Sequence, residues 1–305
     1  MIEKIGNVFL NLDYFKNEDL YNEGDDVEEK ILQTVKQTDD YTNVLASDNR
    51  WPILYQLAKE RENIVEPMDI ALTDDVLEVG AGMGAVTGAL ARRSKSVDCI
   101  ELSKRRSLAN AYRNRKYKNI RIFVGNFQDI PIVKKYDIVT LIGVLEYAQS
   151  YIKSEHPFED FLQKISDALR PGGKMYVAIE NKLGLKYFAG CAEDHLCSPF
   201  SGIEGYTSNQ PVKTFSRSQL NQLILQNGFQ STYFYYPYPD YKLPTIIYSD
   251  DYLPGKTFSI PTSQNFFMDR VVCFDERKAY SSLANAQELK TLSNSFLVEA
   301  VKADA

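Results

Sequence analysis

The sequence predicts an α/β protein with a mostly parallel sheet, because strand-like and helix-like segments alternate along its central part. Short apolar runs rich in β-branched residues are followed by segments with apolar residues at helical spacing. The first run, residues 76–79, leads into three glycines at alternate positions, and a helical pattern follows directly. Of the 305 residues 44% are hydrophobic and 12% aromatic, which is enough to build a sizeable core.

Each element is expected from the same alternation. Seven strands are expected at residues 76–79, 96–101, 121–125, 137–142, 174–179, 231–236 and 296–301, the last at an edge of the sheet. Helices that cover both faces of the sheet are expected at residues 85–93, 104–115, 158–169 and 216–227, and a further helix is expected ahead of the alternation at residues 50–64. The Arg-Pro-Gly-Gly sequence at residues 170–173 is expected to form the turn before the fifth strand.

Two segments lie outside this alternation and define the expected domains. Residues 1–66 are expected to form a helical appendage, and residues 67–305 the main domain. The aromatics Tyr14 and Tyr21 either pin the appendage to the core or face a ligand as part of a lid. Roughly 60 residues separate the last two strands, too many for an ordinary connection, so residues 238–290 are expected to form an inserted cap.

The distribution of charge and the length of the apolar runs indicate whether nucleic acids or membranes are expected as partners. The formal charge of −6 gives no sign of a nucleic-acid partner, although residues 104–118 contain seven basic residues and no acidic one. That stretch either faces phosphates, masked by the acidic residues 1–40, or is the solvated face of a helix. No signal peptide and no membrane span are expected, which favours a cytoplasmic protein. The oligomeric state does not follow from the sequence.

The glycine turn predicts a cradle for a nucleotide-type cofactor. Gly80, Gly82 and Gly84 allow positive φ and close approach of a ligand to the main chain, and the helix start behind them favours an anionic group. Glu101, about 20 residues further at the end of the second strand, can accept hydrogen bonds from ribose hydroxyls. Asn126 follows the third strand, where an amide can read an adenine edge.

These motifs together resemble the class I S-adenosylmethionine-dependent methyltransferases over about residues 74–187. The resemblance implies a Rossmann-like fold and S-adenosylmethionine as the cofactor. The residues that it assigns to the cofactor are Glu78, Gly80, Gly82, Gly84, Glu101, Asn126, Phe127 and Gly143. The family more often has Asp at Asn126, but an amide oxygen still accepts from the adenine amine. A nicotinamide dehydrogenase is disfavoured, since its fingerprint is Gly-x-Gly-x-x-Gly.

A narrower resemblance concerns the acceptor of the methyl group. Residues 19–25, 179–190 and 237–244 resemble a group of bacterial methyltransferases associated with surface-polysaccharide assembly. This implies a sugar or glycan-type acceptor. Candidates for contact with the acceptor are Tyr14, Tyr21, Tyr147 and Asn181.

His195 and Glu146 are the candidate catalytic residues. His195 is either the base that accepts a proton from an acceptor hydroxyl or an ordinary loop histidine. Glu146 either orients a substrate or caps the next segment. Arg61 either reaches the cofactor carboxylate, which suits a guanidinium, or is a solvated helix residue. Cys191 and Cys197 flank His195, but the spacing is not a familiar zinc pattern, so no metal is expected.

We therefore expect a methyltransferase that acts on a small-molecule or glycan-type acceptor, with transfer to oxygen by in-line displacement. Nucleic-acid methylation is the alternative within enzymes, although the Asn-Pro-Pro-aromatic tetrad and an added basic domain are missing. A non-catalytic binding module is the alternative outside enzymes.

Overall fold

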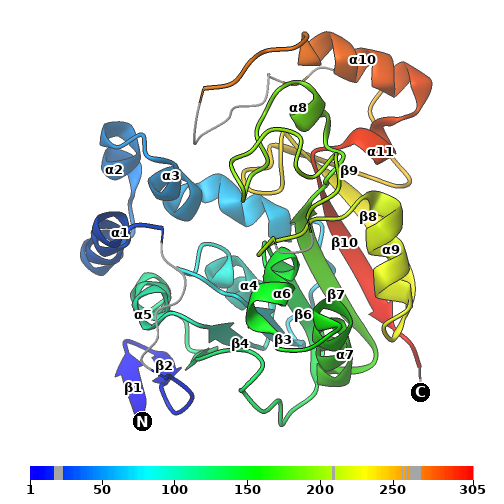
Figure 1. Ribbon diagram of the computed structural model, residues 1–305. Helices are drawn as coiled ribbons and strands as arrows, with labels where there is room; N and C mark the ends of the chain where they lie inside the picture. The colour runs from blue at the N-terminus through cyan, green and yellow to red at the C-terminus, as the bar shows by residue number, and fades with distance from the viewer. Residues whose placement is uncertain (17–22, 208–209, 256, 259, 261–268, 305) are drawn as a thin grey trace. The chain divides into compact units, whose positions relative to one another are not determined.

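The structure, a computed structural model, describes residues 1–16, 23–207, 210–255, 257–258, 260 and 269–304. The chain forms two compact units (Figure 1). The first unit contains residues 1–142 and 167–175, and the second contains residues 143–166 and 176–305.

The first unit carries six complete strands and the helices between them. Its elements are β1 Ile2–Ile5, β2 Val8–Asn11, α1 Asp25–Gln37, α2 Thr42–Ser47, α3 Trp51–Leu57, the 3₁₀ helix η1 Lys59–Val65, β3 Asp75–Val79, α4 Thr87–Arg93, β4 Ser96–Glu101, α5 Lys104–Arg113, β5 Ile120–Val124 and β6 Tyr136–Ile142. Strand β7, Leu169–Glu180, begins in this unit and continues into the second.

The sheet of the first unit has the strand order β1-β2-β5-β4-β3-β6. All neighbours from β2 to β6 are parallel, and only β1 runs antiparallel to β2. Val79 of β3 pairs with Ile100 of β4, and Glu101 pairs with Val124 of β5. The carboxyl ends of these three strands therefore meet at one edge, where open α/β sheets bind ligands.

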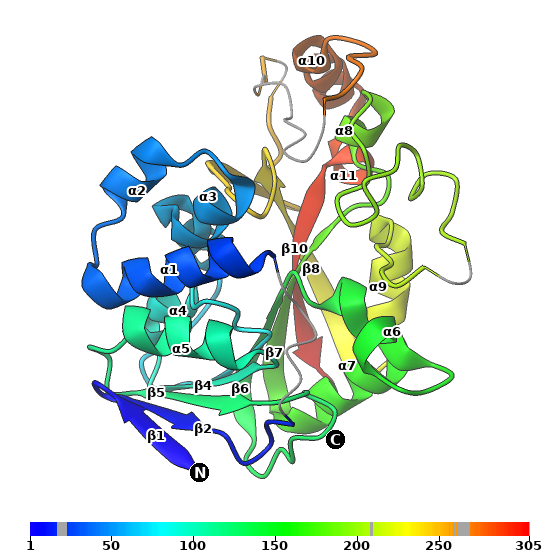
Figure 2. The same ribbon diagram turned by 60° about the vertical axis from the view of Figure 1, so that its left-hand side comes forward.

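Helices form two successive layers on this sheet. Helix α5 contacts β2, β4 and β5, and α1 packs on α5, as Figure 2 shows. Apolar side chains between the layers form a buried cluster: Val27, Ile31, Leu32, Val35, Ile53, Leu57, Met83 and Ala109. The apolar face of the amphipathic helix α1 is thus buried against the other helices.

The basic stretch after β4 is paired with the acidic N-terminal segment. The guanidinium of Arg106 lies 2.9 Å from the carboxylate of Glu28, and both side chains are almost completely buried. Arg105 lies 2.7 Å from Asp25, and Arg115 lies 3.2 Å from Asp39. Arg106 is buried rather than solvated, whereas Arg105 and Arg115 are partly exposed and paired with acids of the first 40 residues. The hypothesis that the acidic segment masks the stretch agrees with these ion pairs.

The second unit is built around antiparallel strands. Its elements are the 3₁₀ helix η2 Leu145–Tyr147, α6 Ala148–Tyr151, α7 Pro157–Ala168, α8 Leu185–Phe188, α9 Arg217–Leu225, β8 Phe229–Tyr238, β9 Ile246–Ser249, α10 Glu276–Ala286, α11 Leu289–Leu292 and β10 Ser295–Lys302; the end of α7 lies in the first unit. The strand order is β7-β10-β8-β9, and α9 packs on β8. Aromatic side chains fill its core, among them Phe234 and Phe296 with ring centroids 5.5 Å apart.

The mostly parallel sheet is confirmed, but the number of strands is not. The described residues contain ten strands, and the sequence analysis missed β1, β2 and β9, each only four residues long. Strand β10 lies between β7 and β8 instead of at an edge. Strand β7 begins at Leu169, so the expected turn at residues 170–173 is part of a strand. The helix expected at residues 50–64 is interrupted at Ala58, whose backbone is extended.

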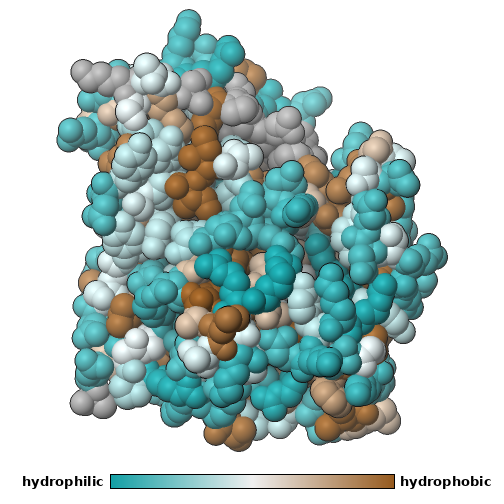
Figure 3. Space-filling view, turned by 180° about the vertical axis from the view of Figure 1, so that it is seen from behind, coloured by the Kyte–Doolittle hydropathy of each residue, from teal (hydrophilic) through white to brown (hydrophobic). Residues whose placement is uncertain are grey.

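Hydrophilic side chains cover most of the face that Figure 3 shows, and hydrophobic side chains form separate small groups on it. Among the described residues, no helix combines the length and the apolar character needed to cross a bilayer.

The ion pair between α1 and α5 gives a test of the packing. In the Arg106→Ala variant, Glu28 keeps its buried position but loses the guanidinium, and we expect the free energy of unfolding to fall by about 3 kcal/mol. Lys104→Ala is the matched control, because Lys104 and Glu3 are 3.9 Å apart and partly exposed; its effect should stay below about 1 kcal/mol. Urea unfolding followed by circular dichroism measures both. Equal losses in the two variants would contradict this account.

Candidate functional site

The turn between β3 and α4 has the geometry of a ligand cradle. Gly80, Gly82 and Gly84 all have positive φ, at 71°, 53° and 75°. A Cβ added at Gly82 would meet nothing within 4 Å, so the main chain there borders open space. A Cβ at Gly84 would stand 2.4 Å from Oδ1 of Asn110, so this glycine is needed for packing against α5. The turn thus exposes its backbone at Gly82 and fixes it at Gly84.

Glu101 joins this turn to the end of β4. Its Oε2 accepts a hydrogen bond from the backbone N–H of Gly82 at 2.7 Å. Its Oε1 accepts one from the N–H of Ser103 at 2.9 Å. The carboxylate is 6% exposed and held in one orientation beside the open space at Gly82. A fixed carboxylate in this place can accept hydrogen bonds from a diol.

Glu78, at the end of β3, and Arg61, in η1, lie close enough to influence one another electrostatically. Oε2 of Glu78 accepts hydrogen bonds from the hydroxyl of Thr87 at 2.7 Å and the thiol of Cys99 at 3.3 Å. Burial raises the pKa of Glu78 to about 7, and Arg61 acts in the opposite direction. Arg61 is 4% exposed, with its guanidinium 4.1 Å from the ring centroid of Tyr55. The view of Arg61 as a solvated residue is therefore wrong.

The remaining candidates of the first unit lie after β5. The side chain of Phe127 is buried, and Oδ1 of Asn126 accepts a hydrogen bond from the N–H of Gln128 at 2.9 Å. The backbone of Tyr14 lies against Gly125, where an added Cβ would stand 2.7 Å from the Tyr14 carbonyl oxygen. Tyr14 is thus next to the same strand end as Asn126. Tyr21 lies outside the described residues.

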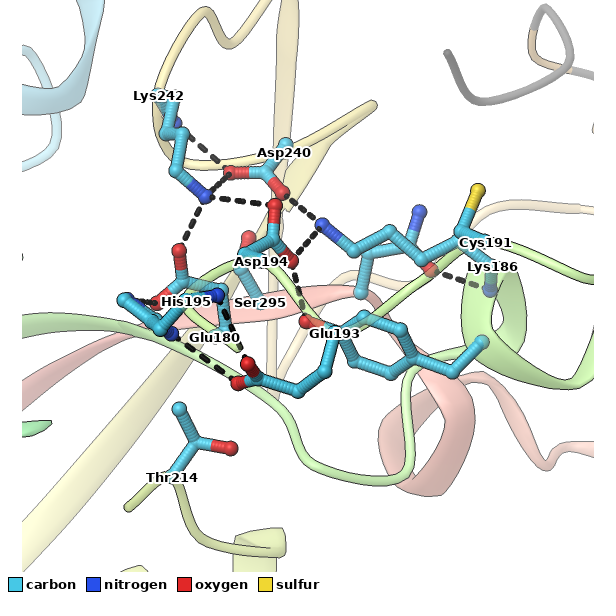
Figure 4. A network of polar contacts seen from close by, with 12 residues as sticks. Glu180, Lys186, Cys191, Glu193, Asp194, His195, Thr214, Asp240, Lys242 and Ser295 are labelled. Atoms are coloured by element: carbon cyan, nitrogen blue, oxygen red, sulfur yellow. Dashed lines mark hydrogen bonds and ion pairs between the residues drawn. The ribbon is translucent and has the colours of Figure 1, made fainter. Parts of the chain in front are cut away.

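In the second unit, His195 is surrounded by carboxylates. Its Nδ1 is 3.1 Å from Oε1 of Glu193. On the other side of the ring, Nε2 is 3.8 Å from Oε1 of Glu146 and 3.8 Å from Oε2 of Glu180. Only 8% of the His195 side chain is exposed. Figure 4 shows His195 between Glu180 and Glu193. The interpretation of His195 as an ordinary surface histidine is wrong, because the loop buries it among acids.

Backbone hydrogen bonds and an aromatic contact hold His195 in place. Oε2 of Glu193 accepts the backbone N–H groups of His195 and Leu196, at 2.8 and 2.7 Å. The ring of Tyr147 meets the imidazole edge-on, with centroids 5.3 Å apart. Tyr206 donates its hydroxyl to Glu193 at 3.1 Å. The loop therefore fixes both the position and the orientation of the imidazole.

Two buried lysines balance part of this negative charge. Lys186 lies 2.8 Å from Asp194 and 2.9 Å from Asp240. Lys242 contacts Oε1 of Glu180 and lies 3.3 Å from Asp194 (Figure 4). The group of buried or nearly buried charges holds two lysines and one histidine against five acids, Glu146, Glu180, Glu193, Asp194 and Asp240. Negative charge is therefore in excess.

The pKa values reflect this excess. Burial and, to a smaller extent, the neighbouring charge of Glu180 raise the pKa of Glu146 to about 8. Burial alone lowers the pKa of His195, but Glu180, Glu193 and Glu146 outweigh it and raise the pKa to about 9. The pKa of Asp194 is lowered, because Lys186 and Lys242 overcome the effect of burial. The raised pKa values thus occur at Glu146 and His195, whereas Asp194, which is paired with lysines, has a lowered pKa.

Three other predicted positions have distinct surroundings in this unit. Gly143 donates its N–H to the carbonyl of Ala178 at 2.9 Å. Asn181 is completely buried, and its amide donates to the carbonyls of Thr291 and Ser293, both at 2.8 Å. Its Oδ1 accepts the N–H of Leu183, so the structure gives this side chain a structural role in place of an acceptor contact. Cys191 is paired with Arg270, with Sγ 2.8 Å from Nη1.

The sequence analysis identified His195 and Glu146, and Glu193 and Asp194 precede His195 directly in the sequence, but it missed the other partners, namely Glu180, Lys186, Asp240 and Lys242. These four lie in the segments 179–190 and 237–244, which were noted only for a resemblance. The signal that was available is the repeated occurrence of acids and lysines among apolar and aromatic residues in both segments.

Known proteins match the region of the glycine turn. Residues 77–175 match a family described as methyltransferase domain. A demethylmenaquinone methyltransferase of Tropheryma whipplei is 25% identical over 214 residues, which cover 67% of this chain and 83% of that protein. A tRNA (guanine-N(7)-)-methyltransferase of Mycobacterium avium is 32% identical over 152 residues, 44% of this chain and 58% of that protein.

Among solved structures, a similar one is the phosphoethanolamine N-methyltransferase 1 of Haemonchus contortus, in complex with phosphoethanolamine and S-adenosylhomocysteine. It is 14% identical with a TM-score of 0.49, and the match covers 92% of this chain and 49% of that chain. The segment that matches the family contains Gly80, Gly82, Gly84, Glu101 and Asn126. The comparisons thus support an S-adenosylmethionine-dependent methyltransferase whose methyltransferase domain includes residues 77–175.

Proposed function

We propose that the protein transfers the methyl group of S-adenosylmethionine to an oxygen atom of a small-molecule or glycan-type acceptor. The observation that carries the acceptor side of this proposal is the buried histidine among three glutamates, an arrangement suited to activating a hydroxyl. The resemblance of residues 179–190 and 237–244 to methyltransferases associated with surface polysaccharides favours a glycan-type acceptor.

In the proposed reaction the first unit binds the donor. Glu101 accepts hydrogen bonds from the ribose hydroxyls, and the exposed main chain at Gly82 allows the methionine part to approach. Asn126 and Phe127 bind the adenine. Glu78 supports the turn through its hydrogen bond with Thr87, and Arg61 lies near Glu78.

The second unit acts on the acceptor. The acceptor oxygen attacks the methyl carbon, the carbon–sulfur bond breaks, and its electron pair remains on sulfur. His195 receives the hydroxyl proton in its neutral form, while Glu193 holds its Nδ1 and Glu146 orients the acceptor. Because the pKa of His195 is raised to about 9, the neutral form and therefore the activity should increase as the pH rises toward 9. Tyr147, which packs edge-on against His195, contributes to acceptor binding. Most of the rate enhancement in such a displacement comes from alignment.

Nucleic-acid methylation is a second candidate, because relatives 32% identical are named tRNA (guanine-N(7)-)-methyltransferases. The pairing of Arg105, Arg106 and Arg115 with acids counts against it, since phosphate binding needs free basic groups. Incubation with tritiated S-adenosylmethionine and separate fractions of RNA, polysaccharide and small molecules tests both. Label in the polysaccharide or small-molecule fraction is expected, and label in RNA alone would overturn the proposal.

The role of Glu101 is tested by Glu101→Gln. An amide keeps the shape of the side chain but loses the charge and one acceptor, so we expect the Kd for S-adenosylmethionine to rise by about 10-fold to 100-fold. Isothermal titration calorimetry measures this Kd. Glu66→Gln, at a side chain that is 73% exposed, is the control and should bind as the parent does. Parent-like affinity of Glu101→Gln would remove Glu101 from the cofactor site.

The role of His195 is tested with the other histidine of the chain as control. His195→Ala should lower methyl transfer to the labelled fraction by about 100-fold or more, because a positioned base typically contributes that much. Its Kd for S-adenosylmethionine should change by less than about 3-fold, since the first unit binds the donor. His156→Ala, at an exposed position before α7, should retain full activity. A loss of donor affinity equal to the loss of turnover would contradict a role at the acceptor.

A further inference from the structure

Two of the acids around His195 have a carboxylate oxygen without a hydrogen-bond partner among the described residues, which indicates a site for a cation. Oε2 of Glu146 and Oε2 of Glu180 are buried and have no hydrogen-bond partner among the described residues. Both side chains are at least 99% buried, with 1% and 0% exposed. A buried carboxylate oxygen without a partner costs several kcal/mol in general, so it is normally paired or bound to a metal.

The two carboxylates and His195 converge on one point. Glu146, Glu180 and His195 each offer a ligand atom, and these three atoms lie within 4.8 Å of one another. Nε2 of His195 is 3.8 Å from an oxygen of each glutamate, too far for a hydrogen bond. Ligand atoms at about 2.1 Å from a tetrahedral ion lie roughly 3.4 Å apart. Each of the two distances from Nε2 to a glutamate oxygen exceeds this value by about 0.4 Å.

The residues behind these ligands have the arrangement found around protein metal sites. Nδ1 of His195 faces Glu193 at 3.1 Å, and a carboxylate in that position selects the tautomer that leaves Nε2 free to bind a metal. Lys242 and the hydroxyl of Tyr241 both contact Oε1 of Glu180, which leaves Oε2 directed at the gap. The lysines are engaged by Asp194 and Asp240 as well.

We propose that Glu146, Glu180 and His195 bind one divalent transition-metal ion. One imidazole with two carboxylates suits Mn²⁺ or Zn²⁺ better than Mg²⁺, which prefers an all-oxygen site and keeps its water. The sequence led us to expect no metal, because the cysteines beside His195 were the obvious partners. The structure pairs Cys191 with Arg270 and instead brings in Glu146 from the 3₁₀ helix η2 and Glu180 from the end of β7.

The catalytic role of the ion adds detail to the proposed function and rests on it. Binding of the ion does not depend on the proposed function. Three protein ligands leave coordination positions for oxygens of the acceptor. A metal-bound hydroxyl has a lowered pKa and loses its proton to solvent. The ion then replaces Nε2 as the group that activates the hydroxyl, and the oxygen attacks the sulfonium methyl as described above.

Metal binding is tested without donor or acceptor. The full chain, with any affinity tag removed and treated with EDTA, is titrated with MnCl₂, ZnCl₂ and MgCl₂ in a calorimeter. We expect one Mn²⁺ or Zn²⁺ per chain and weaker binding of Mg²⁺. Glu146→Gln and Glu180→Gln should each weaken binding by more than 100-fold, and Glu193→Gln by about 10-fold to 100-fold, as for residues that support a ligand.

Controls and a second readout keep the test decisive. Glu159→Gln and His156→Ala, at exposed positions of α7 and just before it, should bind the ion as the parent does. Mn²⁺ or Zn²⁺ should raise the Tm of the parent and of these controls, but not that of Glu146→Gln. The Tm of Glu146→Gln without metal shows whether this variant folds; if it does not, Glu193→Gln decides.

The outcomes separate this proposal from the proposed function. No stoichiometric ion on the parent, or equal loss of binding in ligand and control variants, would overturn the metal site. If His195→Ala still abolished methyl transfer in that case, the proposed function would stand without the ion. One bound ion together with label found only in RNA would support the metal site and reject the proposed acceptor.

Discussion

The carboxylate of Glu101 is the constraint on which the donor side of the molecule depends. It accepts the N–H groups of Gly82 and Ser103, and so fixes the turn after β3 to the end of β4. The parallel register of β3, β4 and β5 brings these strand ends to one edge. Gly84 then packs on Asn110 of α5, which leaves the main chain at Gly82 facing open space. Strand pairing, helix packing and the cradle are thus parts of one arrangement.

In the second unit, charged side chains are buried and only part of their negative charge is balanced by positive charge. Two lysines and His195 face five acids in an interior filled with aromatic side chains. Burying unpaired charge is costly, so such an arrangement is more typical of a functional site than of a device for stability. It raises the pKa of Glu146 through burial and through Glu180, and that of His195 through its glutamates.

The sequence predicted what depends on local patterns. The parallel strands and the glycine turn have strong periodicity and Gly spacing, and the structure contains them where expected. Strands β1, β2 and β9 were missed because they are four residues long and depend on pairing with distant partners. The environment of His195 was missed for a related reason. Glu146, Glu180 and Lys242 meet it only through tertiary folding, which no spacing in the sequence indicates.

The central claim is that the turn at Gly82 and the carboxylate of Glu101 hold S-adenosylmethionine. A crystal structure of the protein with S-adenosylhomocysteine, the product of the donor, tests it most directly. The account predicts the ribose hydroxyls within hydrogen-bond distance of Glu101 and the homocysteine part beside Gly82, with the adenine near Asn126. Homocysteine and ribose bound away from these residues, or no bound product at saturating concentration, would contradict it.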